Sequence, residues 1–324
     1  MRKFTILLVL IALLTLPALG QEPAKSGSPQ DTKGGAQTTG DQKTADTSKI
    51  KVTVNLVNVL FTVFDKKNRL VLDLTKDDLR VFEDKKPQTI RFFSRETDLP
   101  LSIGILIDTS NSIRERLRFE QESAIDFLNT TVRPGKDLAY LVGFDVTPQL
   151  IQDYTDDINK VADAIRTLQA GGGTGLYDAI FFASKEKMLY FPPPEPYLRR
   201  VMVIISDGRD NQSEHTRDEA LGMAQRGEVT IFAISTNRSG LSTQGDKVLK
   251  YLAEQTGGRA FFPFAASDIA ADFRQIAKEL RSQYSLAYVS TNNARDGSFR
   301  NIAVDTLQKE YHVRAKAGYF APAQ

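Results

Sequence analysis

Leu101-Ser-Ile-Gly-Ile-Leu-Ile-Asp-Thr-Ser-Asn-Ser112 is the stretch that decides the fold. Its first seven residues are almost continuously apolar, which is typical of a strand buried on both faces of a parallel sheet. Short polar side chains follow at once, with a carboxylate at Asp108 and hydroxyls at Ser110 and Ser112. In an open α/β sheet, ligands bind outside the carboxyl ends of the strands. The stretch therefore predicts an α/β fold with a ligand site directly after this strand.

The chain around this stretch, from 97 to 283, alternates short apolar runs with amphipathic ones. Such alternation predicts a doubly wound, mostly parallel six-stranded sheet with helices on both faces. We expect strands at 101–107, 138–144, 149–154, 200–205, 229–234 and 259–262, and helices at 113–131, 157–169, 176–189, 217–226, 246–256 and 268–282. Thr216 followed by Glu219 predicts a capping box at the start of one of these helices.

The flanking segments, 51–96 and 284–324, are patterned as strands. The first begins with a run from Val52 to Val63, and Leu70 to Leu74 follows a polar turn like the return of a hairpin. Residues 79–93 alternate on both sides of a turn at 85–87, and three more strands are expected at 284–290, 299–304 and 312–317. We expect the two ends to meet in one small β module, into which the 97–283 domain is inserted.

The first fifty residues predict export. Arg2 and Lys3, an apolar run from 4 to 16, and small residues at Ala18 and Gly20 are typical of a signal peptide spanning 1–20, cleaved after Gly20. The alternative is a retained anchor, but this run falls short of the ~20 apolar residues that usually span a bilayer. Residues 21–50 lack large apolar side chains and predict a disordered tether. The mature protein is expected to have no membrane span and to be secreted, periplasmic or attached to the cell envelope.

Composition narrows the chemistry. The chain has no cysteine, which excludes disulfides and thiolate metal sites, so a metal would need oxygen or imidazole ligands. Loss of Arg2 and Lys3 with the signal leaves 40 basic and 40 acidic residues, since the whole chain has 42 and 40. A formally neutral mature chain argues against nucleic acid or anionic lipid as the main partner.

Two further segments are expected to reach the site after the first strand. Residues 200–208 form a second buried strand that ends in Ser206, Asp207 and Gly208. The glycine-rich run 171–175 leaves Thr174 at the start of a helix. Carboxylate and hydroxyl oxygens converging from three loops are the hard ligands that Mg²⁺ prefers.

Together, Asp108-x-Ser110-x-Ser112, Thr174 in its glycine-rich context and Asp207 before glycine resemble the metal-ion-dependent adhesion site of von Willebrand factor type A (VWA) domains. The segment from Phe64 to Ile90 resembles the part that precedes this domain in secreted bacterial VWFA-related proteins. One departure is Lys85, where that family often turns on a glycine.

The resemblance implies a role for each site residue. Ser110 and Ser112 would bind the metal directly, Thr174 directly or through water, and Asp108 and Asp207 would hold metal-bound waters. The resemblance implies one Mg²⁺, with Mn²⁺ or Ca²⁺ as alternatives, and an open position that an Asp or Glu of a partner protein fills.

Several nearby residues have less specific interpretations. Arg209 and Arg238 are expected on the same rim and would clamp an acidic ligand, the alternative being solvated loop arginines. His215 is expected to be solvated and His312 structural. Asp210 and Asn211 are expected to cap the following turn, the alternative being that they add ligands. The proline-rich run 192–196 is expected to be a rigid loop on the opposite face.

Enzymatic alternatives lack required groups. A phosphatase with an aspartyl nucleophile needs a second aspartate where Ser110 stands. A serine hydrolase needs a histidine base, and the chain has no G-x-S-x-G motif. Residues 171–175 lack the G-K-[ST] ending of a phosphate loop. The sequence therefore predicts a non-enzymatic, adhesion-type protein-binding module. A scaffold with a purely structural metal site is the main alternative, and a hydrolase is the less well supported one.

Overall fold

The computed structural model describes residues 56–96, 98–190, 198–237, 239 and 241–323. The expected signal peptide, the tether at 21–50, the proline-rich run 192–196 and Arg238 lie outside the described residues. The chain divides into residues 1–51 and 52–324, and the following description concerns the second unit. Within the described ranges, no helix is both long and apolar enough to cross a bilayer.

A six-stranded sheet is the centre of the molecule, with the strand order β10-β9-β8-β5-β6-β7. The strands are β5 (Leu101–Asp108), β6 (Leu138–Phe144), β7 (Pro148–Thr155), β8 (Arg199–Ser206), β9 (Thr230–Ser235) and β10 (Ala260–Phe261). All neighbours are parallel except β7, which runs antiparallel to β6 at one edge. Every residue of β5 is buried, as expected for a strand in the middle of a sheet covered on both sides.

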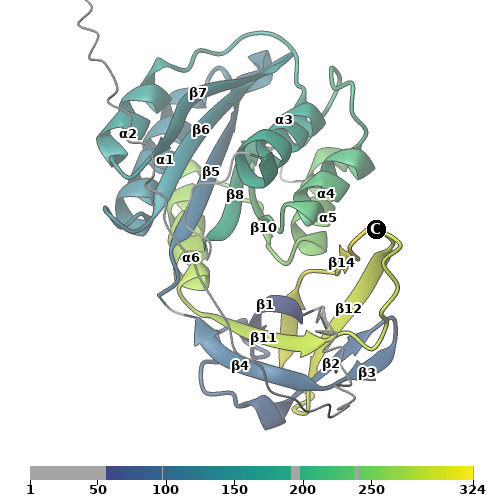
Figure 1. Ribbon diagram of the computed structural model, residues 1–324. Coiled ribbons are helices and arrows are strands. Elements are labelled where there is room, and N and C mark those ends of the chain that lie inside the picture. Colours follow the sequence, from purple (N-terminus) through teal and green to yellow (C-terminus); the bar gives the residue numbers. More distant parts are fainter. Residues whose placement is uncertain (1–55, 97, 191–197, 238, 240, 324) are drawn as a thin grey trace, which may run out of the picture. The chain divides into compact units, whose positions relative to one another are not determined.

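Helices cover both faces of this sheet (Figure 1). They are α1 (Leu117–Thr131), α2 (Ile158–Thr167) and α6 (Ala266–Leu280) on one face, and α3 (Leu176–Phe182), α4 (Arg217–Arg226) and α5 (Gln244–Gln255) on the other. The sheet has an apolar core on each face, and alternate side chains of β5 belong to one or the other. Ile105 packs with the first group of helices and Leu106 with the second. This confirms the predicted doubly wound, mostly parallel α/β fold.

The helix expected at 176–189 changes type halfway along its length. The α-helical part ends at Phe182, and a π-helical segment, η3 (Ala183–Tyr190), continues it. The backbone of this segment is tied to the sheet edge, since the Tyr154 hydroxyl donates to the Lys187 carbonyl at 2.8 Å. The expected capping box is confirmed at the start of α4, where the Glu219 amide donates to Thr216 Oγ1 and the Thr216 amide donates to Glu219 Oε2.

The flanking segments form a β sandwich of two four-stranded sheets, ordered β13-β1-β11-β4 and β14-β12-β2-β3. The strands are β1 (Leu56–Phe64), β2 (Leu79–Glu83), β3 (Lys86–Gln88), β4 (Ile90–Glu96), β11 (Gln283–Val289), β12 (Phe299–Thr306), β13 (His312–Ala315) and β14 (Gly318–Phe320). Each sheet mixes strands from both sides of the six-stranded domain, since β1 pairs with β11 and β2 with β12. Apolar side chains of both sheets, including Phe61, Val81, Leu286 and Val304, share one core.

Two local predictions in the first flanking segment are wrong. Leu70 to Leu74 form no returning strand: a single bridge joins Leu70 to Phe64, because β11 and β13 occupy the two edges of β1. The tight turn lies at Asp84 and Lys85 rather than at 85–87, and both residues have positive φ, at 46° and 66°. Positive φ at both central residues is the geometry that lets a two-residue loop match the twist of its strands.

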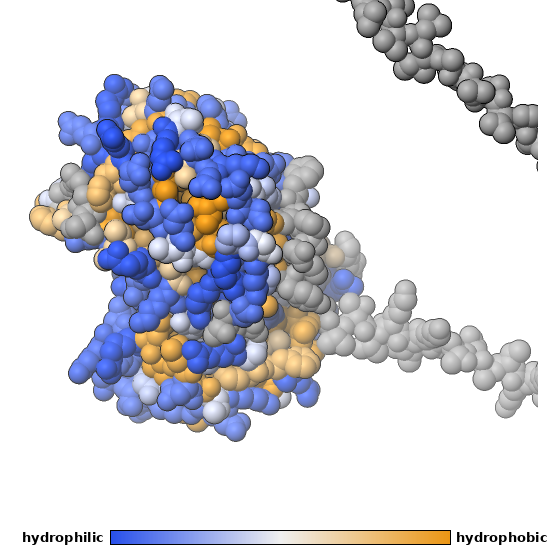
Figure 2. Space-filling model, turned by 90° about the vertical axis from the view of Figure 1, so that its left-hand side faces the viewer, coloured by the Kyte–Doolittle hydropathy of each residue, from blue (hydrophilic) through white to orange (hydrophobic). Residues whose placement is uncertain are grey.

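Figure 2 shows one face of the molecule, largely covered by polar side chains. Apolar surface interrupts it in patches, at the level of the six-stranded sheet and again near the lower end of the view. Within this face, exposed apolar side chains are thus clustered in patches.

Candidate metal site at the carboxyl edge of the sheet

The pairing of β5 with β8 places Asp108 beside Ser206. Ile107 is opposite Ile205 in the parallel register, so the next residue of each strand reaches the same edge of the sheet. The Ser206 hydroxyl donates to Asp108 Oδ2 at 2.7 Å, and the Ser110 amide donates to Asp108 Oδ1 at 2.9 Å. The fully buried carboxylate is therefore held in one orientation by neutral donors of Ser110 and Ser206.

The electrostatics of this carboxylate favour a cation. Burial raises the pKa of Asp108, and the nearby charge of Asp207 raises it further, while hydrogen bonds from Ser110 and Ser206 lower it. A buried negative charge near a second carboxylate is costly unless a positive charge compensates it. The residues present therefore fit a divalent metal ion.

Two hydroxyls stand together in front of Asp108. Ser110 Oγ and Ser112 Oγ are 3.0 Å apart, close enough for both oxygens to contact one ion. The spacing is set by a short 3-10 turn, η2 (Asn111–Ile113), whose N-cap residue is Ser110. The spacing of the two serines thus places two neutral oxygens side by side.

The glycine-rich loop brings Thr174 to the same edge. The Gly171 amide donates to the Thr109 carbonyl at 2.7 Å, which joins this loop to the end of β5. Thr174 is buried, and its amide donates to Asn211 Oδ1 at 3.0 Å, while its carbonyl accepts from the Asn211 amide at 3.0 Å. The three loops are thus connected by hydrogen bonds through their backbones.

Asp207 is the first residue after β8 and lies on the outer side of the site. Its Oδ1 accepts from the Arg209 amide at 3.0 Å, and the Arg209 Nε lies 3.8 Å from Oδ2. The Arg209 side chain is 73% exposed, so it lies at the surface beside Asp207. Arg238, the second arginine expected there, is not described.

The candidate set consists of two carboxylates and three hydroxyls, contributed by Asp108, Ser110, Ser112, Thr174 and Asp207. The structure places all five at the carboxyl edge of the sheet, on three loops that contact one another. The described part of the chain holds no group of three or more His, Cys, Asp or Glu side chains arranged for a metal. Any ion at this site would depend on hydroxyl and water oxygens.

His215 and Asn211 differ from expectation, and Asp210 does more than the expected capping. His215 is not simply solvated: its Nδ1 lies 2.7 Å from Asp178 Oδ1, and its ring stacks on Phe181 at 3.7 Å. Asp210 accepts from the Ser213 amide, as a turn cap does, but its Oδ2 also accepts from the Tyr177 amide in the first turn of α3. Asn211, expected as a cap, instead holds Thr174.

The sequence alone assigned no role to Ser206 or to the backbone amide of Asn211. Ser206 directly precedes Asp207 at the end of a buried strand, and a hydroxyl in that place is the one local pattern that points to it. Asn211 has no such pattern, because its role depends on how the loop folds back on Thr174.

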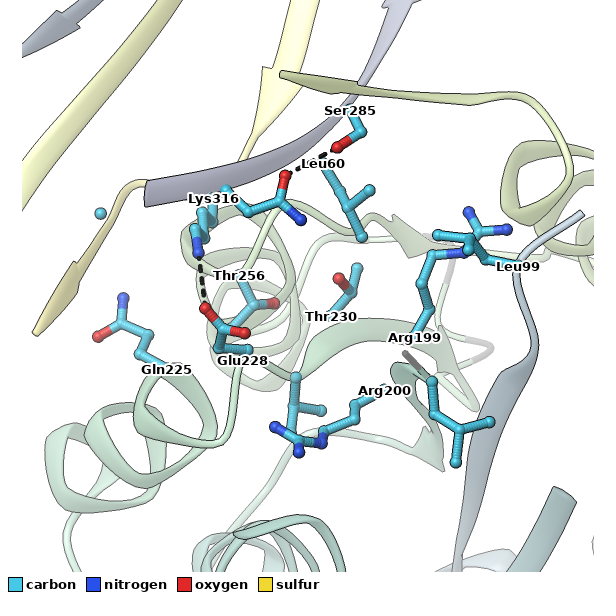
Figure 3. A pocket seen from close by; sticks show the side chains of 14 residues that line it. Leu60, Leu99, Arg199, Arg200, Gln225, Glu228, Thr230, Thr256, Ser285 and Lys316 are labelled. Atoms are coloured by element: carbon cyan, nitrogen blue, oxygen red, sulfur yellow. Dashed lines mark hydrogen bonds and ion pairs between the residues drawn. The ribbon is translucent and has the colours of Figure 1, made fainter. Parts of the chain in front are cut away.

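A separate pocket of about 320 Å³ lies at the opposite ends of the strands (Figure 3). Its lining includes Arg199 and Arg200 at the start of β8, Thr230 at the start of β9, and Lys316, which pairs with Glu228 at 3.3 Å. None of the five candidate metal ligands lines it, so this pocket is not part of the candidate metal site.

These features define an α/β domain with a candidate ligand site at the carboxyl edge of its sheet. Residues 103–209 match the family model for the von Willebrand factor type A domain. This chain therefore contains a VWA domain. Proteins with this domain are generally non-enzymatic interaction modules, and the domain often binds a divalent metal.

Relatives match over part of their length. A UPF0353 protein of Mycolicibacterium paratuberculosis (strain ATCC BAA-968 / K-10) is 26% identical over 204 residues, in an alignment that covers 55% of this chain and 60% of that protein. The von Willebrand factor A domain-containing protein 3B of Homo sapiens is 27% identical over 174 residues, 51% of this chain and 12% of that protein. The chain thus spans less than two thirds of the length of either curated relative.

Solved structures align with part of this chain at low identity and with TM-scores below 0.5. Proximal thread matrix protein 1 of the mussel byssus, solved with a zinc-occupied MIDAS motif, aligns with a TM-score of 0.48 and 16% identity over 61% of this chain and 50% of that one.

Proposed function

We propose that this chain is an exported protein-interaction module that binds an acidic side chain of a partner through one divalent metal ion. The ion would be held at Asp108, Ser110, Ser112, Thr174 and Asp207. The observation that carries the proposal is the buried carboxylate of Asp108, fixed by Ser206 and Ser110 close to Asp207. A fixed carboxylate beside paired hydroxyls is preorganised for a small, hard cation.

The bound metal would supply a Lewis-acidic position that accepts a carboxylate oxygen. Ser110 and Ser112 would bind the ion through their hydroxyls, and Asp108 and Asp207 would orient its waters. Mg²⁺ suits this set because it keeps several waters and needs few protein carboxylates, with Mn²⁺ or Ca²⁺ as alternatives. Only two carboxylates would face the ion, so an acidic ligand from outside is electrostatically favoured.

Arg209 would assist the binding of that ligand. Its guanidinium lies beside Asp207 on the rim, with its side chain largely exposed. A guanidinium can donate two parallel hydrogen bonds to a carboxylate, which suits it to hold the partner's Asp or Glu. Arg238 would contribute in the same way.

Export and domain organisation complete the proposal. Residues 1–20 would direct secretion and be removed after Gly20, and 21–50 would be a tether. The VWA domain at 97–283 would then act outside the cytoplasm, in the periplasm, at the cell envelope or as a secreted protein, with 51–96 and 284–324 forming its β module.

Calorimetric titration with Mg²⁺, Mn²⁺ and Ca²⁺ tests the metal site. Asp108→Ala and Ser112→Ala should each weaken binding at least tenfold, whereas Ser285→Ala, which removes a hydroxyl from the sandwich, should leave binding unchanged. Unaltered affinity in both site variants would refute the ligand assignment.

Capture of partners from an envelope extract tests the adhesive role. Partners should bind the wild type with Mg²⁺ and be released by EDTA, and they should fail to bind Ser112→Ala. A metal that raises the melting temperature without metal-dependent capture would instead show a purely structural ion.

A further inference from the structure

Large apolar side chains are exposed beside the candidate metal site. Leu241 is 75% exposed, Phe264 74% and Phe262 48%. With Pro263, these three line a pocket of about 380 Å³, named here the apolar pocket. An exposed apolar cluster rimmed by polar residues is a common mark of a protein-binding surface, because leaving it in water is unfavourable.

The apolar pocket lies on the same edge of the sheet as Asp108 and Asp207. Leu241 belongs to the loop after β9, and residues 262–264 follow β10, so both segments leave the carboxyl ends of parallel strands. Since β9 pairs with β8, the loop that carries Leu241 is next to the loop that follows β8 and carries Asp207.

The first turn of α5 links the pocket to Asp207 directly. A Cβ atom on Gly245 would lie 2.1 Å from the Asp207 carbonyl oxygen, so the two backbones are in close contact. The next two residues of the helix, Asp246 and Lys247, line the apolar pocket. One turn of helix thus separates the backbone of a candidate metal-site residue from the wall of the pocket.

The exposed charged side chains that line this pocket are basic. Lys247 and Lys250 line it, and both are exposed, although Lys250 also lies 3.8 Å from Glu254. Asp246 is the acidic lining residue, but it is buried and its carboxylate accepts hydrogen bonds from inside the protein. These come from Ser235 Oγ at 2.6 Å, Asn237 Nδ2 at 2.8 Å and the Thr243 amide at 2.8 Å.

The same bonds fix the pocket wall. Asp246 joins the end of β9 to the capping box of α5, and Asn237 Nδ2 also donates to the Leu241 carbonyl at 2.9 Å. A wall that is ordered before binding costs less conformational entropy when a ligand arrives.

We propose that the apolar pocket is the second half of the partner site. The partner is a protein segment that places an Asp or Glu on the metal and inserts a neighbouring Leu or Phe among Leu241, Phe262 and Phe264. A further acidic residue of that segment faces Lys247 and Lys250. The inference rests on the proposed function, since the metal anchors the same segment.

Selection of random peptides displayed on phage tests this pairing. The full chain is immobilised with Mg²⁺, and bound phage are eluted with EDTA. We expect the recovered peptides to combine an acidic residue with a Leu, Phe or Trp a few positions away.

A synthetic copy of the most enriched peptide then serves as the probe for variants. Leu241→Ser and Phe264→Ser should each weaken its binding about tenfold or more, since each removes apolar area buried against the peptide. Neither should alter Mg²⁺ affinity. Phe92→Ser is the matched control, because Phe92 is 64% exposed but lies on β4 of the sandwich. Lys247→Glu should weaken the binding of the acidic peptide by a similar factor. This variant tests the charge alone, because it leaves the apolar side chains intact.

The outcomes separate the two proposals. The recovered peptides could be acidic without any apolar preference and bind Leu241→Ser, Phe264→Ser and Lys247→Glu as well as the wild type. This result would refute the second half of the site and leave the metal-dependent function standing. Failure to recover any EDTA-released peptide would refute both. Dimers in sedimentation that Phe264→Ser abolishes would show that a second copy of this chain covers the pocket, which would also overturn the inference.

Discussion

At the scale of single residues, Ser206 decides how Asp108 is presented. Its hydroxyl donates to the buried carboxylate at 2.7 Å and accepts from the Gly208 amide at 3.1 Å, so it joins two loops of the site. Neither contact is replaced when the hydroxyl is removed, because an alanine side chain cannot form hydrogen bonds. The carboxylate would keep only its hydrogen bonds from Ser110.

Ser206→Ala should therefore lower the free energy of unfolding by about 1–2 kcal/mol in EDTA, the usual cost of leaving a buried group without its partner. Urea denaturation with and without Mg²⁺ measures this, and metal affinity should fall as well. Ser285→Ala, which removes an exposed bond to Asn58, is the control and should change stability by less than about 0.5 kcal/mol. Equal stability of Ser206→Ala and wild type would show that the bond is not needed to hold Asp108.

Asp272 gives a pH dependence away from the site. Burial raises its pKa from 3.8 to about 6, with Asp268 adding to the rise and Arg259 opposing it. Between these two values the folded protein holds a proton that the unfolded chain has released. Stability must therefore fall as pH rises from about 4 to 6, and the loss remains above pH 6.

Asp272→Asn removes this penalty, because the amide carries no charge. The free energy of unfolding should rise by about 1 kcal/mol at pH 7, after allowance for solvent screening, and stay the same at pH 4. Denaturation curves at the two pH values test this, with Asp163→Asn on an exposed helical position as control. A gain that is equal at both pH values would show that charge is not its cause.

At the scale of elements, buried strands were the easiest features to predict from the sequence. β5 and β8 are continuous apolar runs with a polar end, and such runs have one stable place, in the middle of a covered sheet. The capping box at Thr216 was predictable for a similar reason, since its two side chains act within one turn. Local patterns were reliable where the stabilising contacts are themselves local.

Elements whose partners lie far along the chain were not predictable in this way. Leu70 to Leu74 read as a return strand, yet β1 is occupied by β11 and β13, more than 200 residues away. The π-helical half of the helix after Gly175 is tied to the sheet edge through Tyr154, and this contact is tertiary. In the site, the Asp108 motif is local, but the bond from Ser206 exists only because of the register between two strands.

The β2–β3 hairpin carries a correctable strain. Lys85 has a φ of 66°, a left-handed conformation that costs a residue with a Cβ about 1–2 kcal/mol. Glycine adopts it freely but loses more entropy on folding. The net effect of Lys85→Gly should be a gain of about 0.5–1 kcal/mol in the free energy of unfolding.

Thermal and urea denaturation of Lys85→Gly measure this gain. Lys86→Gly, one residue further along and inside β3, is the matched control and should be destabilising, since glycine weakens a strand. Stabilisation by both changes would place the effect in the unfolded chain or in the lost charge rather than in the turn.

At the scale of the whole molecule, the two flanking segments depend on each other. In the sheet β13-β1-β11-β4, the strands β1 and β4 are joined only through β11, which comes from the other end of the chain. In the second sheet, β12 separates β14 from β2. Removing either segment leaves the other with unpaired strand edges and half of a core.

The VWA domain has its own two cores, so it should not share this dependence. Its contacts with the second flanking segment include polar and aromatic ones: Arg314 pairs with the buried Glu279 of α6, and the Ala317 amide donates to the Gln255 carbonyl at 3.1 Å. The Arg226 guanidinium of α4 lies 3.8 Å from the centroid of the Phe320 ring in β14. Glu279 would keep Arg259 as a partner, at 3.4 Å, when Arg314 is removed.

Residues 98–282 alone should therefore fold cooperatively, somewhat less stably than the full chain, and bind Mg²⁺ with an affinity within about threefold of it. Residues 56–96 alone should show no cooperative unfolding, because two or three strands without a covered apolar face are not independently stable. Circular dichroism during urea titration tests both fragments, and calorimetry tests the metal affinity of the larger one. Residues 98–282 should also unfold with a smaller dependence on urea than the full chain, since they expose less surface. Cooperative unfolding of residues 56–96 alone would show that the flanking segments are separate modules, and loss of structure in 98–282 would show that the sandwich is required to fold the VWA domain.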